Sequence, residues 1–389
     1  MKFLTAGESH GKALNCIITD YPSGVAIDIN FINSELSRRQ KGFGRGGRMS
    51  IEKDTIDILS GIRKGRSTGS PISFLINNKD WDNWKDKIEK EKDILNPRPG
   101  HADLSGFLKY RLESIRDVIE RSSARETAAR TAAGAFAKLI LTSIGIFIIS
   151  YVNRIGDIML TEEINIGRNF NPLINSEDKI TVEKIESSDL RCPDDKITLR
   201  MHELINKASE QGDTLGGAFK LCASGVVPGL GSYIQWDKRI NSRIASALCS
   251  IPSVKAVGFG KIFSLKNLKG TYYHDEIFYN SNSGFYRNKN NAGGIEGGMT
   301  NGEVIDIEVI LKPIPTTKTG LNTVNIKTKE QTDSLKERSD ICAVPSAAVV
   351  GEAVLAIEIL NAIQEKFGYD SLEEIQENIK NYKKYLNNV

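Results

Sequence analysis

Residues 120–137 read ERSSARETAARTAAGAFA, a run that predicts a helix made largely of small side chains. Ser123 followed by Glu126 three positions later fits a capping box, so the helix is expected to begin near Ser123. Free N–H groups and the helix dipole at such a start favour an anion, and Arg121 and Arg125 add positive charge. The small residues allow a neighbouring helix or a cofactor to approach the backbone closely.

A second stretch resembles the first. Residues 337–339 repeat the Glu-Arg-Ser of residues 120–122, and a glycine lies thirteen positions past the arginine in each case. Pro345 is a favourable first-turn residue, so a second small-residue helix is expected from Pro345 to about residue 360. Asp340, at the entrance of this helix, is a candidate proton acceptor.

A glycine pattern upstream also occurs twice. Residues 61–72 and 294–305 both read G-I-x-x-G-x-x-x-G-x-x-I, with an offset larger than that of the two helices. An insertion in the charged stretch 77–96 accounts for the difference. Two structurally related halves in one domain are therefore predicted, and chance matching of short glycine and alanine patterns is the alternative.

Other segments predict further elements. Residues 105–119 carry Leu108, Leu112, Ile115 and Ile119 on one helical face. Strands are expected at 14–19 and 51–59, the end of a buried helix followed by a strand at 139–152, and a surface loop at 280–291. The chain is expected to divide into a catalytic domain at 1–360 and a peripheral helical tail at 361–389.

Composition limits the class of protein. The chain has 389 residues, 40% hydrophobic and 26% charged, which is typical of a globular protein. A net charge of +3 argues against bulk binding to nucleic acid or to a membrane surface. The longest apolar stretch, 139–152, is shorter than the roughly 20 residues of a spanning helix.

The cysteines and the amino terminus indicate the compartment. The five cysteines are far apart and form no C-x-x-C pair, which predicts reduced, mostly buried thiols and neither a zinc site nor a disulfide framework. Glu8 and His10 lie where a signal peptide needs an apolar run, so a cytoplasmic protein is expected.

Two histidines lie in glycine-containing turns. His10 is flanked by Gly7 and Gly11, and His101 follows a Pro-Gly pair with Asp103 near enough to orient it. Histidine suits proton transfer near neutral pH. The alternative is a histidine in a turn without a chemical role.

Residues 38–48, RRQKGFGRGGR, hold five cations with no acid nearby. Their formal G-x-G-x-x-G lacks the preceding strand and following apolar helix of a dinucleotide site. Arginine pairs bidentately with phosphate and carboxylate, so the segment predicts an anion clamp. A solvated basic loop and an RNA contact are the alternatives. Two further segments, 293–300 and 312–316, suggest backbone shaped around a flat or phosphorylated ligand.

Together these segments resemble the chorismate synthase family, in its bacterial form without an appended flavin-reductase domain. The resemblance runs from residue 1 to about residue 359 in the family's order. The motifs that carry it are GESHG, RRQKGFGRGGRMSIE, GSPISFLINNKDW, RPGHAD, RSSARETAART, GDTLGG, PGLGSYIQWD, AGGIEGGMTNG, KPIPT and ERSDICAVP.

The resemblance implies a 1,4-anti elimination of phosphate from 5-enolpyruvylshikimate 3-phosphate, giving chorismate with no net redox change. It implies reduced FMN (FMNH2) as cofactor, supplied by an external reductant. It also implies a single α+β domain with a helical layer sandwiched between antiparallel sheets, and a homotetramer. An intrinsic NADPH-dependent flavin reductase activity and a non-catalytic RNA- or anion-binding protein are the alternatives.

The resemblance also assigns residues. His10 matches the histidine that protonates the departing phosphate, His101 the one that protonates the reduced flavin, and Asp340 the aspartate that helps remove the ring proton. The implied anion-binding residues are Arg39, Arg45, Arg48, Arg98, Arg125 and Arg338. The implied flavin-contacting residues are Ser123, Ala124, Arg125, Ser253, Gly297, Lys312, Pro313, Ile314, Pro315, Thr316 and Arg338. At position 253 the family usually has alanine, so Ser253 is a departure from its pattern.

Overall fold

Two antiparallel sheets hold most of the strand residues. The computed structural model describes the chain except for residues 46–52, 88–89, 91–92, 266–267, 282–283 and 336–339. The first sheet has the order β1-β2-β6-β3, formed by β1 (Lys2–Ala6), β2 (Ala13–Thr19), β6 (Ile72–Asn77) and β3 (Ile56–Ile58). The second has the order β10-β15-β9-β7-β8, formed by β10 (Val254–Phe259), β15 (Ile305–Leu311), β9 (Gly217–Ser224), β7 (Phe147–Ile155) and β8 (Ile158–Met159).

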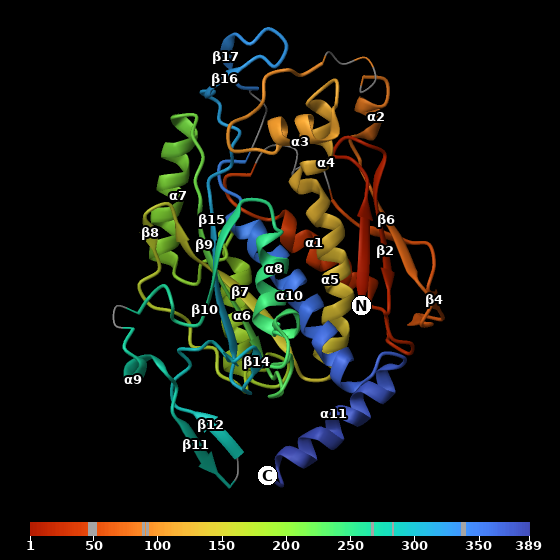
Figure 1. Cartoon of the computed structure of the whole chain (residues 1–389), viewed down its shortest axis with the longest axis vertical. Helices are drawn as coiled ribbons and strands as arrows, with labels where there is room; N and C mark the ends of the chain where they lie inside the picture. Colours follow the sequence, from red (N-terminus) through yellow and green to blue (C-terminus); the bar gives the residue numbers. More distant parts are fainter. Residues whose placement is uncertain (46–52, 88–89, 91–92, 266–267, 282–283, 336–339) are drawn as a thin grey trace.

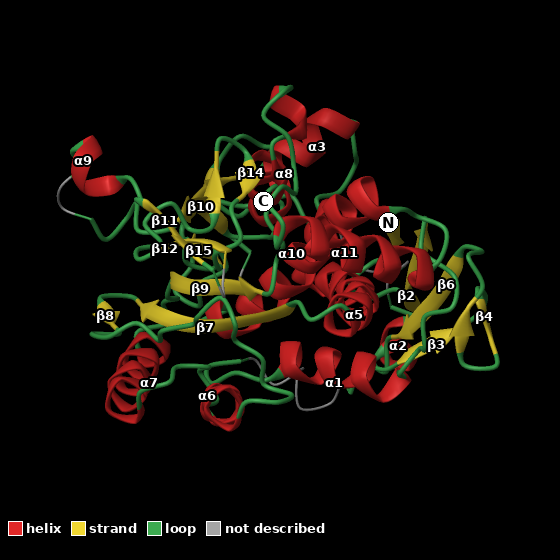
Figure 2. Cartoon of the chain, turned by 90° about the horizontal axis from the view of Figure 1, so that it is seen from below, coloured by secondary structure: helices red, strands yellow, loops and turns green. Residues whose placement is uncertain are grey.

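Helices pack between the two sheets. Figure 2 shows α5 (Thr127–Ser143) and α10 (Val344–Phe367) between the strands of the first sheet and those of the second. α1 (Ile29–Gln40) packs against both of these helices, and α8 (Ile240–Cys249) packs against α10 and β10. The mixed α+β class with antiparallel sheets is therefore confirmed.

α5 and α10 cross at close range. A Cβ added to Gly134 would lie 2.4 Å from the Cα of Ala353, so a side chain at position 134 would force the helices apart. α10 is long and apolar enough to span a membrane, but 89% of its apolar window is buried inside the protein. It is therefore the core helix of the fold.

The two sheets share one order of elements. In the first half the chain runs β1, β2, α1, β3, β6, α5, and in the second it runs β7, β9, α8, β10, β15, α10. Corresponding strands occupy corresponding positions in their sheets, with β8 added at one edge. The hairpin β4 (Ile62–Arg63) and β5 (Arg66–Ser67) precedes β6 as β13 (Ile295–Glu296) and β14 (Met299–Thr300) precede β15. This topology supports two related halves over chance matching.

The helix expected at 105–119 is wrong. The chain forms α3 (Asp103–Tyr110) and α4 (Arg116–Ser122), because Arg111 adopts a left-handed conformation with φ 54°. Leu108 is 63% exposed, and of the four residues on the expected face only Ile115 and Ile119 are buried. A continuous helical period in the sequence does not detect such a break.

The start of α5 differs in detail from the expected capping box. The Ser123 hydroxyl accepts from the Arg125 N–H at 3.2 Å and caps a 3₁₀ turn, η2 (Ala124–Glu126), before α5 begins at Thr127. Glu126 instead accepts a hydrogen bond from the Thr5 hydroxyl at 2.7 Å and pairs with Arg130.

Other expectations are confirmed or corrected. The strand at 14–19 is confirmed by β2, and the helix end and strand within 139–152 by α5 and β7. The strand at 51–59 is limited to β3 in the described part of that range. The surface loop expected at 280–291 is wrong in part: β11 (Ile277–Asn280) and β12 (Gly284–Arg287) pair as a hairpin, and residues 288–291 follow it outside the strands. Four cysteines are buried and Cys249 is exposed.

The tail is packed onto the core. α10 continues past residue 360 to Phe367, and α11 (Leu372–Leu386) buries Ile375 and Ile379. The expected boundary at 360 therefore lies inside a core helix. The remaining described elements are α2 (Trp81–Trp84), α6 (Ser176–Ser187), α7 (Asp195–Glu210), η3 (Trp236–Lys238), α9 (Gly270–Tyr273), β16 (Asn322–Val324) and β17 (Gln331–Asp333).

Candidate active site

Most of the predicted site residues gather at one end of the molecule. The β1–β2 turn, the last turn of α1, the first turns of α5 and α10, and the end of β15 all lie toward the upper end in Figure 1. His10, Arg39, Arg125 and Asp340 come from these elements or directly adjoin them. The parallel directions of α5 and α10 bring the two helix entrances to the same end.

His10 is held by a carboxylate and an aromatic ring. Its Nδ1 lies 2.9 Å from Oε1 of Glu120, and its backbone N–H donates to Oε2 of Glu120 at 2.7 Å. The imidazole packs on Trp84 with ring centroids 4.1 Å apart. Burial alone would raise the pKa of Glu120, but the hydrogen bonds from His10 outweigh it and hold the pKa below its usual value. Glu120 therefore faces His10 as a carboxylate at neutral pH.

The turn that carries His10 is tied to the neighbouring elements. Nδ2 of Asn78 donates to the carbonyl of Gly11 at 2.6 Å. The hydroxyls of Ser123 and Ser9 lie 3.1 Å apart, which joins the turn to the start of α5. The position of His10 is thus set by β6 and by the entrance of α5 together.

Asp54 joins two of the predicted arginines. Its carboxylate accepts from Nη1 of Arg125 at 2.7 and 2.8 Å and from Nη2 of Arg39 at 2.9 Å. Burial would raise the pKa of Asp54, but the hydrogen bonds and charges of Arg125 and Arg39 lower it. Burial lowers the pKa of Arg39 to about 10, which leaves it cationic at neutral pH. Two cations therefore share one carboxylate, and the local charge favours an anion.

Asp340 lies beside a third arginine. Nε of Arg45 is 3.0 Å from Oδ2 of Asp340, and Nη1 of Arg45 lies 3.4 Å from the carbonyl of Arg39. These contacts place the candidate proton acceptor next to the arginine-rich segment. The predicted anion-binding residues Arg48 and Arg338 lie outside the described residues.

His101 forms a second histidine–carboxylate pair. Its Nδ1 lies 2.5 Å from Oδ1 of Asp103, which is fully buried. Burial would raise the pKa of Asp103, but the hydrogen bonds from His101 and Arg98 hold it well below its usual value. Asp103 thus orients His101, as the sequence predicted.

Arg98 has a different setting from the other predicted anion-binding arginines. Its Nε and Nη2 donate to Asp103 at 2.8 and 3.0 Å, and its Nη1 donates to the hydroxyl of Thr316 at 3.1 Å. All three guanidinium nitrogens are therefore engaged by the protein, and Arg98 links the His101 turn to the segment after β15.

The segment 312–316 begins directly after β15. The Lys312 N–H donates to the carbonyl of Ser253 at 2.9 Å, and the Lys312 ammonium donates to the carbonyl of Gly100. The hydroxyl of Thr214 donates to the carbonyl of Ile314 at 2.6 Å, between Pro313 and Pro315. Ser253 has φ 71°, a left-handed conformation uncommon outside glycine. These residues share the end of the molecule that holds His101.

Gly297 lies at the opposite end of β15 from His101 and the segment 312–316. It lies in the turn between β13 and β14, before β15 begins, whereas Lys312 follows the end of β15. Seven residues of strand separate the two ends by about 20 Å. The contacts among the described residues therefore give no support to the predicted flavin contact of Gly297.

Sequence patterns did not single out several polar residues at this end. Glu120, Asp54 and Asn78 each contact a predicted site residue. Glu120 directly precedes Arg121 in the ERSSARE motif, which is the signal that could have drawn attention to it. Two cavities of about 420 and 760 Å³ lie elsewhere, near η3 and β1, and no predicted site residue lines either of them.

Comparisons with known proteins agree on one family. A family model described as chorismate synthase matches residues 1–364. The chain is 50% identical over 391 residues to a chorismate synthase of Sulfurihydrogenibium sp. (strain YO3AOP1), covering 98% of each chain. It is 47% identical over 397 residues to that of Aquifex aeolicus (strain VF5), covering 100% of this chain and 98% of the relative. A crystal structure of chorismate synthase superposes with a TM-score of 0.80 at 38% identity, covering 100% of this chain and 98% of that one.

Proposed function

The chain belongs to the chorismate synthase family, and we propose that its active site is the end of the molecule where His10, His101 and the arginines meet. The enzyme is a phosphate lyase that eliminates phosphate from 5-enolpyruvylshikimate 3-phosphate to give chorismate. The observation that carries the location is the pair of histidine–carboxylate contacts beside the buried guanidinium groups of Arg39, Arg98 and Arg125.

His10 acts as the acid for the leaving phosphate. Its Nδ1 faces Glu120, and Nε2 is the ring atom that we assign to the leaving phosphate. A phosphate leaves poorly until its developing charge is protonated or paired, and a positioned histidine contributes typically 10²–10⁴-fold to such a step. Glu120 fixes the orientation of the ring and stabilises it when it carries the proton.

Arg39, Arg45 and Arg125 bind the phosphate and carboxylates of the substrate. They are fixed before the substrate arrives, because Asp54 and Asp340 hold their guanidinium groups. Cations held in place stabilise charge without reorganising during the reaction. The roles of Arg48 and Arg338 stay predictions of the same kind.

Reduced FMN is the proposed cofactor. When bound, it supplies transient electron density to the allylic system of the substrate, which no side chain can do. The residues that would hold it are Ser123, Ala124, Arg125, Ser253 and the segment 312–316. Their setting fits such a group, since the Ser123 hydroxyl, the Arg125 guanidinium and the Lys312 ammonium are donors for a phosphate or a flavin oxygen. The hydroxyl of the adjoining Thr317 is buried without a hydrogen-bond partner among the described residues.

Two further proton-handling residues complete the proposal. His101, held by Asp103 and contacted by Nη2 of Arg98, is the residue proposed to handle the flavin proton, and the adjoining Gly100 contacts Lys312. Asp340 takes up the proton released from the substrate ring, and the adjacent Arg45 stabilises it as a carboxylate before that transfer. A neighbouring cation favours the charged form of a carboxylate.

The architecture and setting of the enzyme are proposed from the same resemblance. The shared topology of the two sheets fits two related halves that enclose a helical layer, with the active site where their helix entrances meet. A cytoplasmic homotetramer that receives reduced flavin from an external reductant fits the family. No observation favours an intrinsic NADPH-dependent reductase, and none is proposed.

An anaerobic assay tests the reaction and the cofactor together. Purified protein with FMN and a chemical reductant should convert the substrate to chorismate, and omission of either should abolish turnover. Titration of reduced FMN with and without substrate should show binding of the flavin. No turnover under these conditions would contradict the proposal.

A further inference from the structure

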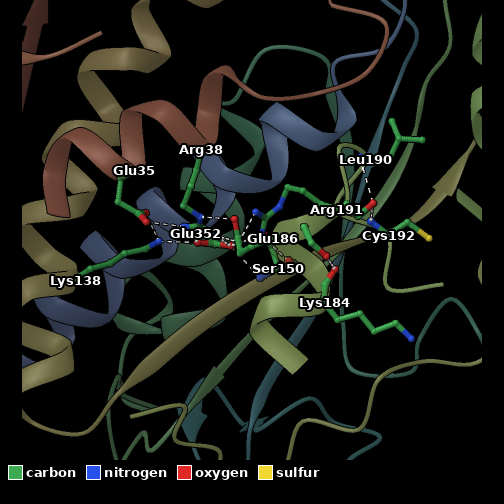
Figure 3. Close-up of polar contacts among 12 residues, drawn as sticks. Glu35, Arg38, Lys138, Ser150, Lys184, Glu186, Leu190, Arg191, Cys192 and Glu352 are labelled. Atoms are coloured by element: carbon green, nitrogen blue, oxygen red, sulfur yellow. Dashed lines mark hydrogen bonds and ion pairs between the residues drawn. The ribbon is translucent and has the colours of Figure 1, made fainter. Parts of the chain in front are cut away.

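Six ionisable side chains form a buried cluster that the proposed reaction does not use. They come from α1, α5, α6, α10 and the segment after α6, and they number three acids and three bases: Glu35, Arg38, Lys138, Glu186, Arg191 and Glu352 (Figure 3). We call this set the charge cluster. Its formal charges cancel. One member, Arg38, directly precedes Arg39 in α1.

Glu352 is the centre of the charge cluster and is fully buried. Its carboxylate accepts from Arg38 at 2.8 and 3.0 Å, from Lys138 at 2.6 Å and from Arg191 at 3.0 Å. The hydroxyl and N–H of Ser150 in β7 donate to it at 2.6 and 3.0 Å. Burial would raise the pKa of Glu352, but the three cations hold it well below its usual value.

Arg38 extends the charge cluster away from α10. It donates to Glu35 at 2.7 Å and to both oxygens of Glu186 at 2.6 and 3.0 Å. Glu186 also accepts from Arg191 at 2.6 Å. The last turn of α1 is thus joined to the segment that follows α6.

The same segment contacts the beginning of the arginine-rich loop. The N–H of Phe43 donates to the carbonyl of Asp189 at 3.2 Å. The ring of His202 packs on the ring of Phe43 at 4.3 Å, while its Nε2 lies 2.8 Å from Oδ1 of Asp189. Asp189 lies between Glu186 and Arg191 in the sequence, so the charge cluster and this clasp share one short segment.

The far side of the loop root, residues 39–45, is attached to the start of α10. The carbonyl of Gly44 accepts from the N–H of Ile341 at 2.8 Å. Gly44 has φ 77°, and a Cβ there would lie 2.8 Å from a methyl group of Ile205. The root is therefore attached at the end of α1, at Phe43 and at Gly44.

A buried cluster of charges needs a reason beyond stability. Desolvation of ionic groups is costly, and apolar replacements of buried ion pairs are often as stable. What such a cluster does supply is geometry, because each charge must meet its partners in one arrangement. Arg38 in the charge cluster and Arg39 in the candidate site are consecutive, so a rotation of α1 that breaks the first set of contacts also displaces the second.

We propose that the charge cluster, together with the Asp189–His202 clasp, positions the root of the arginine-rich loop. It sets the rotation of α1 and the place of Phe43, and these fix Arg39 and Arg45 for binding of the anionic substrate. The inference rests on the anion-binding role proposed above for these two arginines. Glu352 and His202 are positioning residues, since they act through Arg38 and Phe43.

The central test is Glu352→Gln, which keeps the shape of the side chain and removes its charge. Amide hydrogen exchange at Phe43 should accelerate about tenfold or more. The KM for the enolpyruvyl substrate should rise about tenfold, with a smaller change in kcat, because misplaced arginines weaken binding. The double variant Glu352→Gln/Lys138→Met restores equal numbers of acids and bases and should recover part of the lost thermal stability.

Asp306→Asn is the matched control. Asp306 is also a buried carboxylate paired with a buried lysine, since Nζ of Lys220 lies 3.1 Å from its Oδ1. It lies in β15, away from the loop root. This variant should lower Tm while leaving exchange at Phe43 and the KM unchanged.

The proposal would be overturned if Glu352→Gln and Asp306→Asn lowered Tm equally and Glu352→Gln changed neither the exchange at Phe43 nor the KM. If Glu352→Gln does not fold, His202→Ala decides, because His202 lies nearer the surface and its loss should still accelerate exchange at Phe43 and raise the KM. Unchanged values in His202→Ala would then overturn it. The exchange measurement needs no turnover, so failure of this inference is distinct from failure of the proposed reaction.

Discussion

Oε1 of Glu120 lies 2.9 Å from Nδ1 of His10, and the other oxygen of the same carboxylate accepts the backbone N–H of His10 at 2.7 Å. The two contacts fix both the ring and the main chain of one residue. Nδ1 of His101 likewise lies 2.5 Å from Oδ1 of Asp103, but the other oxygen of Asp103 accepts the backbone N–H of Arg98 at 3.0 Å. Each carboxylate therefore faces Nδ1 of its histidine, and Nε2 of His101 lies 3.3 Å from Nη2 of Arg98.

Glu120→Gln should lower kcat about 10²-fold with little change in KM, because the amide neither stabilises the protonated His10 ring nor fixes its tautomer. Steady-state kinetics on the enolpyruvyl substrate with reduced FMN check this. Asp117→Asn, an exposed change on the same helix, is the control and should retain wild-type kcat. A wild-type kcat in Glu120→Gln would remove the positioning role of Glu120.

Arg45→Lys should raise the KM for substrate about tenfold and leave Tm nearly unchanged. A lysine retains the charge but loses the planar fork that pairs with phosphate and carboxylate while contacting Asp340. Arg63→Lys, on the exposed β4–β5 hairpin, should leave the KM unchanged. If the two variants have the same KM, Arg45 does not contact the substrate.

The free energy of unfolding should fall as the pH is lowered from about 5 to about 3. Asp54, Asp103 and Glu120 have folded-state pKa values below their usual ones. In this range the unfolded carboxylates bind protons and the folded ones do not, so acid favours the unfolded state and the stabilisation is lost as pH falls.

Asp54→Asn should therefore flatten the pH dependence of the free energy of unfolding, measured by urea denaturation across the same range. The exposed Asp57→Asn in β3 is the control and should retain the wild-type slope. An unaltered slope in Asp54→Asn would show that the contacts with Arg39 and Arg125 do not lower the pKa of Asp54.

Gly134→Ala should destabilise the protein by about 2 kcal/mol or more, because the added methyl would lie 2.4 Å from the backbone of Ala353. Thermal unfolding measures the loss. Gly167→Ala is the control, since a Cβ at Gly167 meets nothing within 4 Å. Similar Tm values for the two variants would contradict the close crossing of α5 and α10.

Local pattern was sufficient for several parts of the fold. The alanine-rich helices, the start of α10 near Pro345 and the strand at 14–19 depend on neighbouring residues, and the structure has each of them within a few positions. The break at Arg111 was missed because one residue with φ 54° interrupts a helix without altering its hydrophobic period. The hairpin at 277–287 was missed because its polar turn resembles an irregular loop.

By itself the sequence determined the family, the repeated order of glycines and alanines, and the two histidine turns, since all of these depend on residues close together in the chain. Only the tertiary structure decided the partners of the buried charges. Glu120 is 110 positions from His10, and Glu352 is 314 positions from Arg38. No local period carries such a pairing, because it arises from how α1, α4, α5 and α10 pack. The contact of Arg98 with Thr316 likewise joins residues 218 positions apart, and Gly297 lies at the other end of β15 from Thr316.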